Sequence, residues 1–166
     1  DKNWGREIPT EFAKPIPAHI QPFMDIEAHS MLELDAPKHT KLRTSVLRAF
    51  TSRRIKSLAP DIESLSNSLI DNFDAAPDLL PAFCTPIPVT IIARLIGAPE
   101  QDAPLLLDWS HKMVAMYQAN RTRADETAAA TASPEFAAYL TDLQTDRRKH
   151  PREDLISALV AATDNL

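Results

Sequence analysis

A histidine and an arginine in this sequence have a spacing that could bind a carboxylate. His39 and Arg43 are four residues apart, so in a helix their side chains project from one face. Val46 and Phe50 continue that face as an apolar stripe. Two basic donors at the mouth of an apolar stripe form a fork that suits a carboxylate, but a solvated basic helix face would have the same spacing. The pattern alone leaves both interpretations open.

Basic side chains are concentrated around these two residues. The formal net charge of the chain is −5, yet no acidic residue lies between Asp35 and Asp61. A basic cluster within an acidic protein indicates one local anionic partner rather than a general affinity for nucleic acid. The basic residues of this interval are Lys38, Lys41, Arg43, Arg48, Arg53, Arg54 and Lys56.

Helices are the elements expected to position this cluster. The chain of 166 residues has 2 glycines against 14 prolines, which favours helices with stiff, proline-marked connections over sheets. Hydrophobic residues make up 44% and charged residues 25%, as in an ordinary globular domain with one core. Asp35 could cap the helix that carries His39 and Arg43, with Pro37 in its first turn.

Apolar periodicity predicts about seven helices and no strand. Residues 1–35 are expected to be mostly irregular, and the polar, alanine-rich residues 120–133 to form a loop or a poorly packed helix. The segment 89–96 is apolar on nearly all sides, which predicts that it is buried, and Gly97 is placed to end it. Ser133-Pro134-Glu135 has the composition of a helix start. The predicted helices lie near 23–29 and over 36–50, 60–74, 89–96, 100–117, 133–149 and from 153 onward.

Several kinds of chemistry have no motif in the sequence. It contains no glycine-rich phosphate loop, no nucleophile elbow and no histidine pair with zinc-binding helical spacing. No apolar run approaches the roughly 20 residues that cross a bilayer. The one cysteine, Cys84, excludes an internal disulfide and fits a reducing compartment. Its apolar neighbours predict a small buried thiol rather than a metal ligand.

Three stretches of the sequence together carry a resemblance to a known family. The first is Leu34-Asp35-Ala36-Pro37-Lys38-His39-Thr40-Lys41-Leu42-Arg43, followed by Ala49-Phe50-Thr51-Ser52-Arg53-Arg54. The second is Pro86-Ile87-Pro88-Val89-Thr90-Ile91-Ile92 with Leu95-Ile96-Gly97-Ala98-Pro99. The third is Arg147-Arg148 with Pro151, then Asp154-Leu155-Ile156-Ser157-Ala158-Leu159-Val160. In this order they resemble the C helix, the D–E region and the G–H region of soluble bacterial-type cytochromes P-450.

The resemblance implies an all-α fold, namely the N-terminal helical part of the cytochrome P-450 fold, roughly from the B–C loop through the H helix. The chain would form a single partial domain, with 1–35 as a B/B–C-loop-like segment, 36–166 as a helical segment, and the C-terminal haem-ligand half absent. The parent protein would be a haem-thiolate monooxygenase that inserts one oxygen atom from O2 into a hydrophobic small molecule. This segment alone would be inactive.

The same resemblance implies a cofactor, partners and site residues. The cofactor would be haem b, with its cysteine ligand outside this segment and with His39 and Arg43 on its propionates. A cytoplasmic protein with a ferredoxin-type electron donor and a hydrophobic substrate is expected, without nucleic acid or membrane. The alternative is a non-catalytic, all-helical interaction module with a basic anion-binding face. The pocket would include Met31, Leu32 and Met113, and the electron donor would dock at Lys41, Arg48, Arg53 and Arg54.

Overall fold

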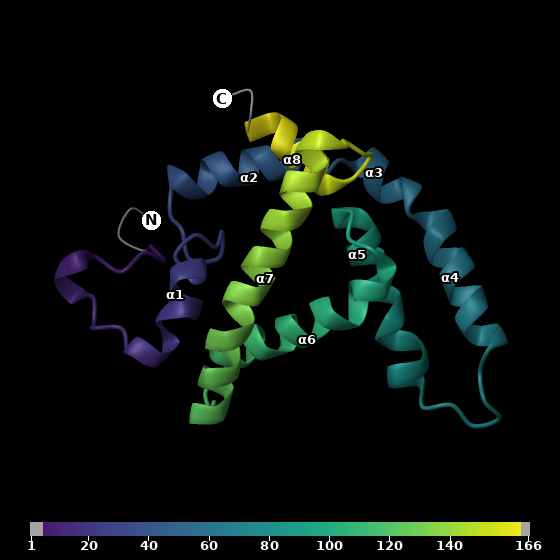
Figure 1. Ribbon diagram of the computed structural model, residues 1–166, viewed down its shortest axis with the longest axis horizontal. Coiled ribbons are helices and arrows are strands. Elements are labelled where there is room, and N and C mark those ends of the chain that lie inside the picture. The colour runs from purple at the N-terminus through teal and green to yellow at the C-terminus, as the bar shows by residue number, and fades with distance from the viewer. Residues whose placement is uncertain (1–4, 164–166) are drawn as a thin grey trace. The chain divides into compact units, whose positions relative to one another are not determined.

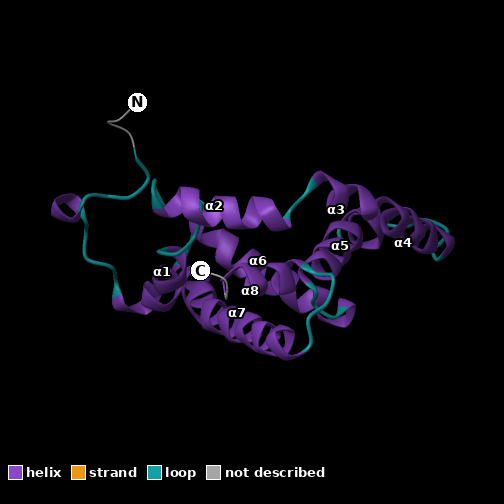
Figure 2. Cartoon of the chain, turned by 90° about the horizontal axis from the view of Figure 1, so that it is seen from above, coloured by secondary structure: helices purple, strands orange, loops and turns teal. Residues whose placement is uncertain are grey.

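The computed structural model describes residues 5–163, and within them the side chains of Thr10, Ala49, Arg53 and Thr163 are not described. The described residues form helices and loops without any strand (Figure 2), which confirms the all-α expectation. Short 3-10 turns and one π turn, Leu80–Cys84, supplement the α-helices. These helices, shown in Figure 1, are α1 Gln21–Glu27, α2 Lys38–Ala49, α3 Ser52–Ser57, α4 Ala59–Asp71, α5 Pro86–Ile96, α6 Ala103–Val114, α7 Arg123–Lys149 and α8 Leu155–Thr163.

The chain divides into two compact units, which we describe separately. Unit 1 contains the described residues up to Val46 together with Asp108–Asp142. Unit 2 contains Leu47–Leu107 and the described residues from Leu143 onward. The candidate donors His39 and Arg43 both belong to unit 1.

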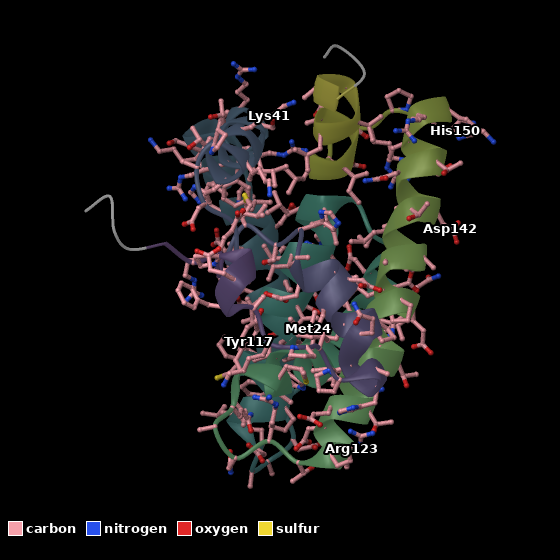
Figure 3. All side chains as sticks on the ribbon, turned by 90° about the vertical axis from the view of Figure 1, so that its left-hand side faces the viewer. Met24, Lys41, Tyr117, Arg123, Asp142 and His150 are labelled. Atoms are coloured by element: carbon pink, nitrogen blue, oxygen red, sulfur yellow. The ribbon has the colours of Figure 1, made fainter. Side chains whose placement is uncertain are left out.

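Unit 1 has a small apolar core to which α1, α7 and the 3-10 turn after α6 contribute. The core side chains are Ile20, Phe23, Met116 and Ala129, with Met24 and Met113 packed against them. Two hydrogen bonds join distant segments beside it. His19 Nε2 lies 2.7 Å from Glu126 Oε2, and the Tyr117 hydroxyl donates to Glu27 Oε1 at 2.6 Å. Figure 3 labels Met24 and Tyr117 among the side chains of this unit.

The prediction that a helix begins at Ser133-Pro134 is wrong, because α7 continues through Pro134. The alanine-rich segment before it, expected to be loop or poorly packed, is the first half of α7. Ala129, Ala132 and Ser133 are buried there, and the Ser133 hydroxyl donates to the Ala129 carbonyl at 2.8 Å. A proline inside a helix costs about 3 kcal/mol, and burial of this small-residue face offsets that cost.

In unit 2, α5 is the helix that most other elements contact. It meets α4, the π turn and α8, and it ends at Gly97, whose φ of 88° confirms the predicted glycine stop. All-round burial of this helix is not observed: Ile91 and Ala93 are buried, but Ile92 is 54% exposed. Cys84, expected to be buried, is also exposed, because it lies at the end of the π turn rather than inside the unit.

A buried ion pair joins the end of α7 to the start of α8 within unit 2. The Arg147 Nε donates to Asp154 Oδ2 at 2.5 Å, and the two side chains are only 3% and 5% exposed. Asp154 also caps α8 by accepting the Ser157 amide at 2.7 Å. Arg147 further donates to the Gly97 carbonyl at the end of α5. One guanidinium therefore connects the ends of three helices.

Candidate functional site

The start of α2 differs from the simple cap expected at Asp35. The backbone carbonyl of Asp35 accepts the His39 amide at 2.9 Å, as in a first helical turn. Its carboxylate, however, accepts the amides of Arg6 and Glu7, at 2.7 and 2.8 Å, instead of amides of α2. The Arg6 amide and then the Glu7 amide hold the pKa of Asp35 below its ordinary value. Asp35 therefore ties α2 to a segment far away in sequence.

His39 and Arg43 lie one turn apart on α2, as the spacing predicts. The His39 side chain is half-buried and that of Arg43 is exposed. Neither forms a side-chain hydrogen bond or an ion pair with the residues that the structure describes. Both donors are consequently available to an external acceptor, and a carboxylate is the acceptor whose charge and geometry match them.

His39 and Arg43 are donors of the kind that could bind the carboxylates of a porphyrin. No group of three His, Cys, Asp or Glu side chains that could hold a metal ion occurs within residues 5–163. Cys84 is exposed and has no such neighbours. The chemistry that this site offers is thus the binding of anionic side groups by His39 and Arg43.

The other residues predicted from the resemblance occupy different environments. Met31 and Leu32 are exposed in the loop before α2, at 38% and 62%, whereas Met113 packs against the core of unit 1. Lys41, which Figure 3 labels, and Arg48 are exposed on α2. The last two predicted basic residues belong to α3: Arg54 is half-buried, and the side chain of Arg53 lies outside the described part of the chain.

Sequence reasoning missed the residues at 5–7 that hold Asp35. Their partners are 28 and 29 positions away, so no local spacing reveals them. One signal was present: the chain has only 2 glycines, and a side chain at either one would meet an aspartate carboxylate. A Cβ at Gly5 would collide with Asp35, and one at Gly97 with Asp154.

A second cluster of side chains depends on tertiary packing, so local sequence spacing does not predict it. Trp109 of α6 stacks edge-on against Phe136 and lies 5.5 Å from the Tyr139 ring. Its indole N–H donates to Glu135 at 3.0 Å. This cluster fixes α6 against α7 inside unit 1, and we assign it a structural role.

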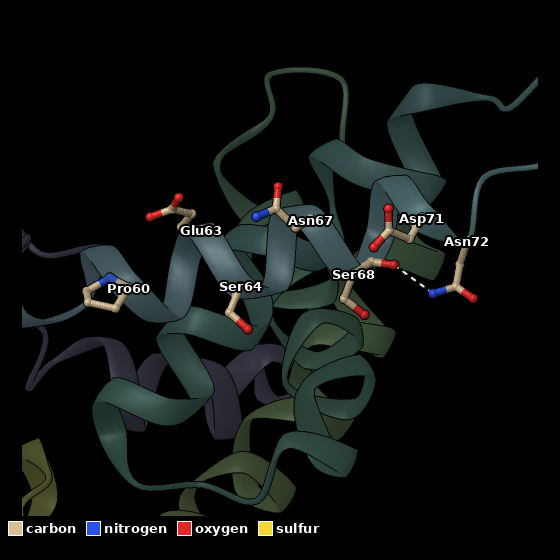
Figure 4. A pocket seen from close by; sticks show the side chains of 7 residues that line it. All are labelled: Pro60, Glu63, Ser64, Asn67, Ser68, Asp71 and Asn72. Carbon is tan, nitrogen blue, oxygen red and sulfur yellow. Dashed lines mark hydrogen bonds between the residues drawn. The ribbon is translucent and has the colours of Figure 1, made fainter.

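The hollows of the surface do not enlarge the candidate site. One lies along α4 (Figure 4), where the Asn72 amide donates to the Ser68 carbonyl at 2.6 Å. All of its lining residues belong to α4 and its C-cap, so it is a helix face without an opposite wall: Pro60, Glu63, Ser64, Asn67, Ser68, Asp71 and Asn72. A more apolar groove in unit 2 runs from Leu80 to Leu107 between the π turn, α5 and the start of α6. Within residues 5–163 no helix has the length and apolar composition to cross a membrane.

Comparisons with known proteins show which proteins the chain resembles in sequence. It is 36% identical over 160 residues to the cytochrome P450 monooxygenase PikC of Streptomyces venezuelae, covering 92% of this chain and 37% of that protein. It is 35% identical over 137 residues to the mycinamicin IV hydroxylase/epoxidase of Micromonospora griseorubida, covering 81% of this chain and 33% of that protein. No family profile matches the chain.

A comparison of folds gives the same result. P450BioI, solved in complex with hexadec-9Z-enoic acid ligated acyl carrier protein, matches with a TM-score of 0.84 and 27% identity over 93% of this chain and 41% of that one. The chain thus spans about a third of the length of the curated relatives that it matches. The match to PikC covers 92% of this chain and the structural match covers 93% of it. The chain belongs to the cytochrome P450 family.

Proposed function

We propose that this chain is part of a haem-thiolate monooxygenase that inserts one oxygen atom from O2 into a hydrophobic small molecule. The observation that carries the proposal is the 36% identity to a P450 monooxygenase, together with a pair of basic donors on α2 that no described side chain occupies. Because the chain spans about a third of its relatives, we assign the activity to the complete protein and none to this segment alone.

The proposed task of this segment is to hold the cofactor by its carboxylates. Haem, when bound, supplies the oxygen activation. Arg43 presents a planar guanidinium that can donate two parallel hydrogen bonds to one carboxylate, and His39 adds one further donor. Moving carboxylates out of water beside a porphyrin costs several kcal/mol unless charged donors compensate. His39 and Arg43 supply that compensation from one helical face.

Substrate and electron donor follow from the same proposal. The exposed apolar side chains of Met31 and Leu32 before α2 support contact with a hydrophobic substrate, whereas Met113 belongs to the core of unit 1, so its position adds no support. Exposed Lys41 and Arg48 on α2 support docking of an acidic, ferredoxin-type electron donor in the cytoplasm.

The experiment is a haem titration of the complete apoprotein carrying single substitutions on α2. Arg43→Ala should weaken haem binding by roughly ten- to a hundredfold, because a charged hydrogen bond contributes about 1.5–3 kcal/mol. His39→Ala should act in the same direction with a smaller effect. Lys41→Ala is the matched control, since it removes a positive charge from the same helix but from a different face.

The titration separates the proposal from its alternative. Unchanged haem affinity in both Arg43→Ala and His39→Ala, or an equal loss in Lys41→Ala, would remove the propionate assignment. A complete protein that binds no haem at all would favour the non-catalytic helical module.

A further inference from the structure

Three consecutive residues near the start of the described chain form a backbone seat for the Asp35 carboxylate. The amides of Arg6 and Glu7 both donate to one oxygen, Asp35 Oδ2, at 2.7 and 2.8 Å. A Cβ on Gly5 would collide with the same oxygen, so the carboxylate lies directly against the backbone there. We call Gly5, Arg6 and Glu7 the amide seat.

The side chains of Arg6 and Glu7 also contact residues on both sides of Asp35 in the sequence. On the preceding side, Arg6 donates to the Leu32 carbonyl at 2.9 Å and to Glu33 Oε1 at 3.0 Å. On the following side, the Glu7 carboxylate accepts the Lys38 ammonium at 3.5 Å, and it also accepts the Asp35 amide at 3.4 Å. The backbone from Leu32 to Asp35 is thus held by contacts outside α2, and Glu7 adds one contact to Lys38, the first residue of α2.

This fixed segment leads directly into the turn that carries the donors. The carbonyl of Asp35 accepts the His39 amide at 2.9 Å, and that of Pro37 accepts the Lys41 amide at 3.1 Å. Arg43 follows His39 by one turn of the same helix. The position of both donors is therefore set by the position of Asp35, because helix geometry leaves the first turn no independent freedom.

We propose that Asp35 is a positioning residue for cofactor binding: seated on Gly5, Arg6 and Glu7, it fixes the start of α2 so that His39 and Arg43 meet the haem carboxylates. This inference rests on the proposed function. In this proposal Asp35 acts through the amide seat on one side and the first turn of α2 on the other.

The decisive variants are Asp35→Ala and Asp35→Asn in the complete apoprotein, titrated with haem. Asp35→Ala removes the acceptor of both amides and should weaken haem binding about tenfold, the lower end of the loss seen when a partner that orients a ligand is removed. Asp35→Asn should remain close to wild type, because both amides use one oxygen and the amide oxygen of Asn has two lone pairs. Gly5→Ala places a Cβ against the Asp35 carboxylate and should weaken haem binding to the same extent as Asp35→Ala.

Asp125→Ala is the matched structural control within unit 1. The Asp125 carboxylate accepts the Thr122 amide at 2.7 Å just before α7, so its loss also frees a carboxylate contact at a helix start. It should leave haem affinity unchanged. A second readout, hydrogen exchange in the apoprotein, should show faster exchange of the His39 amide in Asp35→Ala and Gly5→Ala but not in Asp125→Ala.

A cycle that combines Asp35→Ala with the His39→Ala/Arg43→Ala double variant distinguishes failure of this inference from failure of the proposed function. If Asp35 acts through His39 and Arg43, Asp35→Ala should cause almost no further loss of haem affinity in the His39→Ala/Arg43→Ala protein. Loss of haem affinity in Arg43→Ala but not in Asp35→Ala would overturn the positioning role and leave the proposed function intact. Unchanged affinity in all of these variants would overturn both, and equal losses in Asp35→Ala and Asp125→Ala would reduce Asp35 to general structural support.

Discussion

Removal of the Arg147 side chain should destabilise the protein far more than removal of an ordinary surface cation. Arg147 and Asp154 are 3% and 5% exposed and lie 2.5 Å apart. Arg147→Ala leaves the Asp154 carboxylate buried without its countercharge, a change that costs about 3–5 kcal/mol. The Ser157 amide still bonds this carboxylate at 2.7 Å, so we expect the lower end, about 3 kcal/mol.

The measurement is urea unfolding of the complete protein at neutral pH, with Lys112→Ala as the control. Lys112 pairs with Asp108 at 2.5 Å, but these side chains are 41% and 53% exposed, and such pairs contribute only about 0–1 kcal/mol. A loss of less than about 1 kcal/mol in Arg147→Ala, or one equal to that in the control, would refute the claim that this pair is a buried junction.

The pH dependence of the free energy of unfolding gives an independent check on the Arg147–Asp154 pair. Burial acts to raise the pKa of Asp154, but the Ser157 amide and the Arg147 guanidinium outweigh it and hold the pKa below its ordinary 3.8. In the wild type this carboxylate therefore contributes stability above pH 3.8 and loses it as the pH falls through the lower folded-state pKa. In Arg147→Ala burial is less opposed and that pKa rises. The difference in unfolding free energy between wild type and Arg147→Ala should shrink as the pH is lowered towards 4, because the unpaired Asp154 carboxylate of the variant takes up a proton.

Two further predictions concern a glycine and the basic face of α2. Gly97→Ala should lower the free energy of unfolding by at least about 1 kcal/mol, because Gly97 has a φ of 88° and the new Cβ would meet Asp154. In a protein that carries Asp154→Ala this collision is gone, and Gly97→Ala should cost less. An equal loss in both backgrounds, measured by urea unfolding, would show that the contact with Asp154 is unimportant. Lys41→Glu should slow reduction by a ferredoxin-type donor at low salt and approach the wild-type rate at high salt in stopped-flow experiments, since the Debye length falls from about 30 Å at 0.01 M to about 3 Å at 1 M. The exposed Lys14→Glu is its charge-matched control, and equal rates for all three proteins at low salt would exclude a docking role.

The sequence predicts those parts of the fold that depend on local signals. The helix with His39 and Arg43, the stop of α5 at Gly97 and the all-α class can all be predicted, because spacing and backbone preference act over a few residues. Pro134 shows where this approach fails. Its local composition favours a helix start, but burial of neighbours such as Ala132 stabilises a continuous helix.

The candidate site shows the same division between local and long-range information. One turn of helix brings His39 and Arg43 together, so their spacing alone predicts the pair. The contact between Asp35 and the amides of Arg6 and Glu7 depends on how the chain folds back over nearly thirty residues, about which local periodicity gives no information. Sequence patterns therefore predict that His39 and Arg43 share a helix face, but not the contact that we propose positions them.

Membership of this chain in a haem-thiolate enzyme is tested most directly by the ferrous–CO absorption spectrum of the complete protein after reconstitution with haem. We expect the red-shifted band of a thiolate-ligated haem, with reduced amplitude in Arg43→Ala at limiting haem. A complete protein that takes up no haem, or one whose ferrous–CO band has the position of an imidazole-ligated haem, would contradict the account.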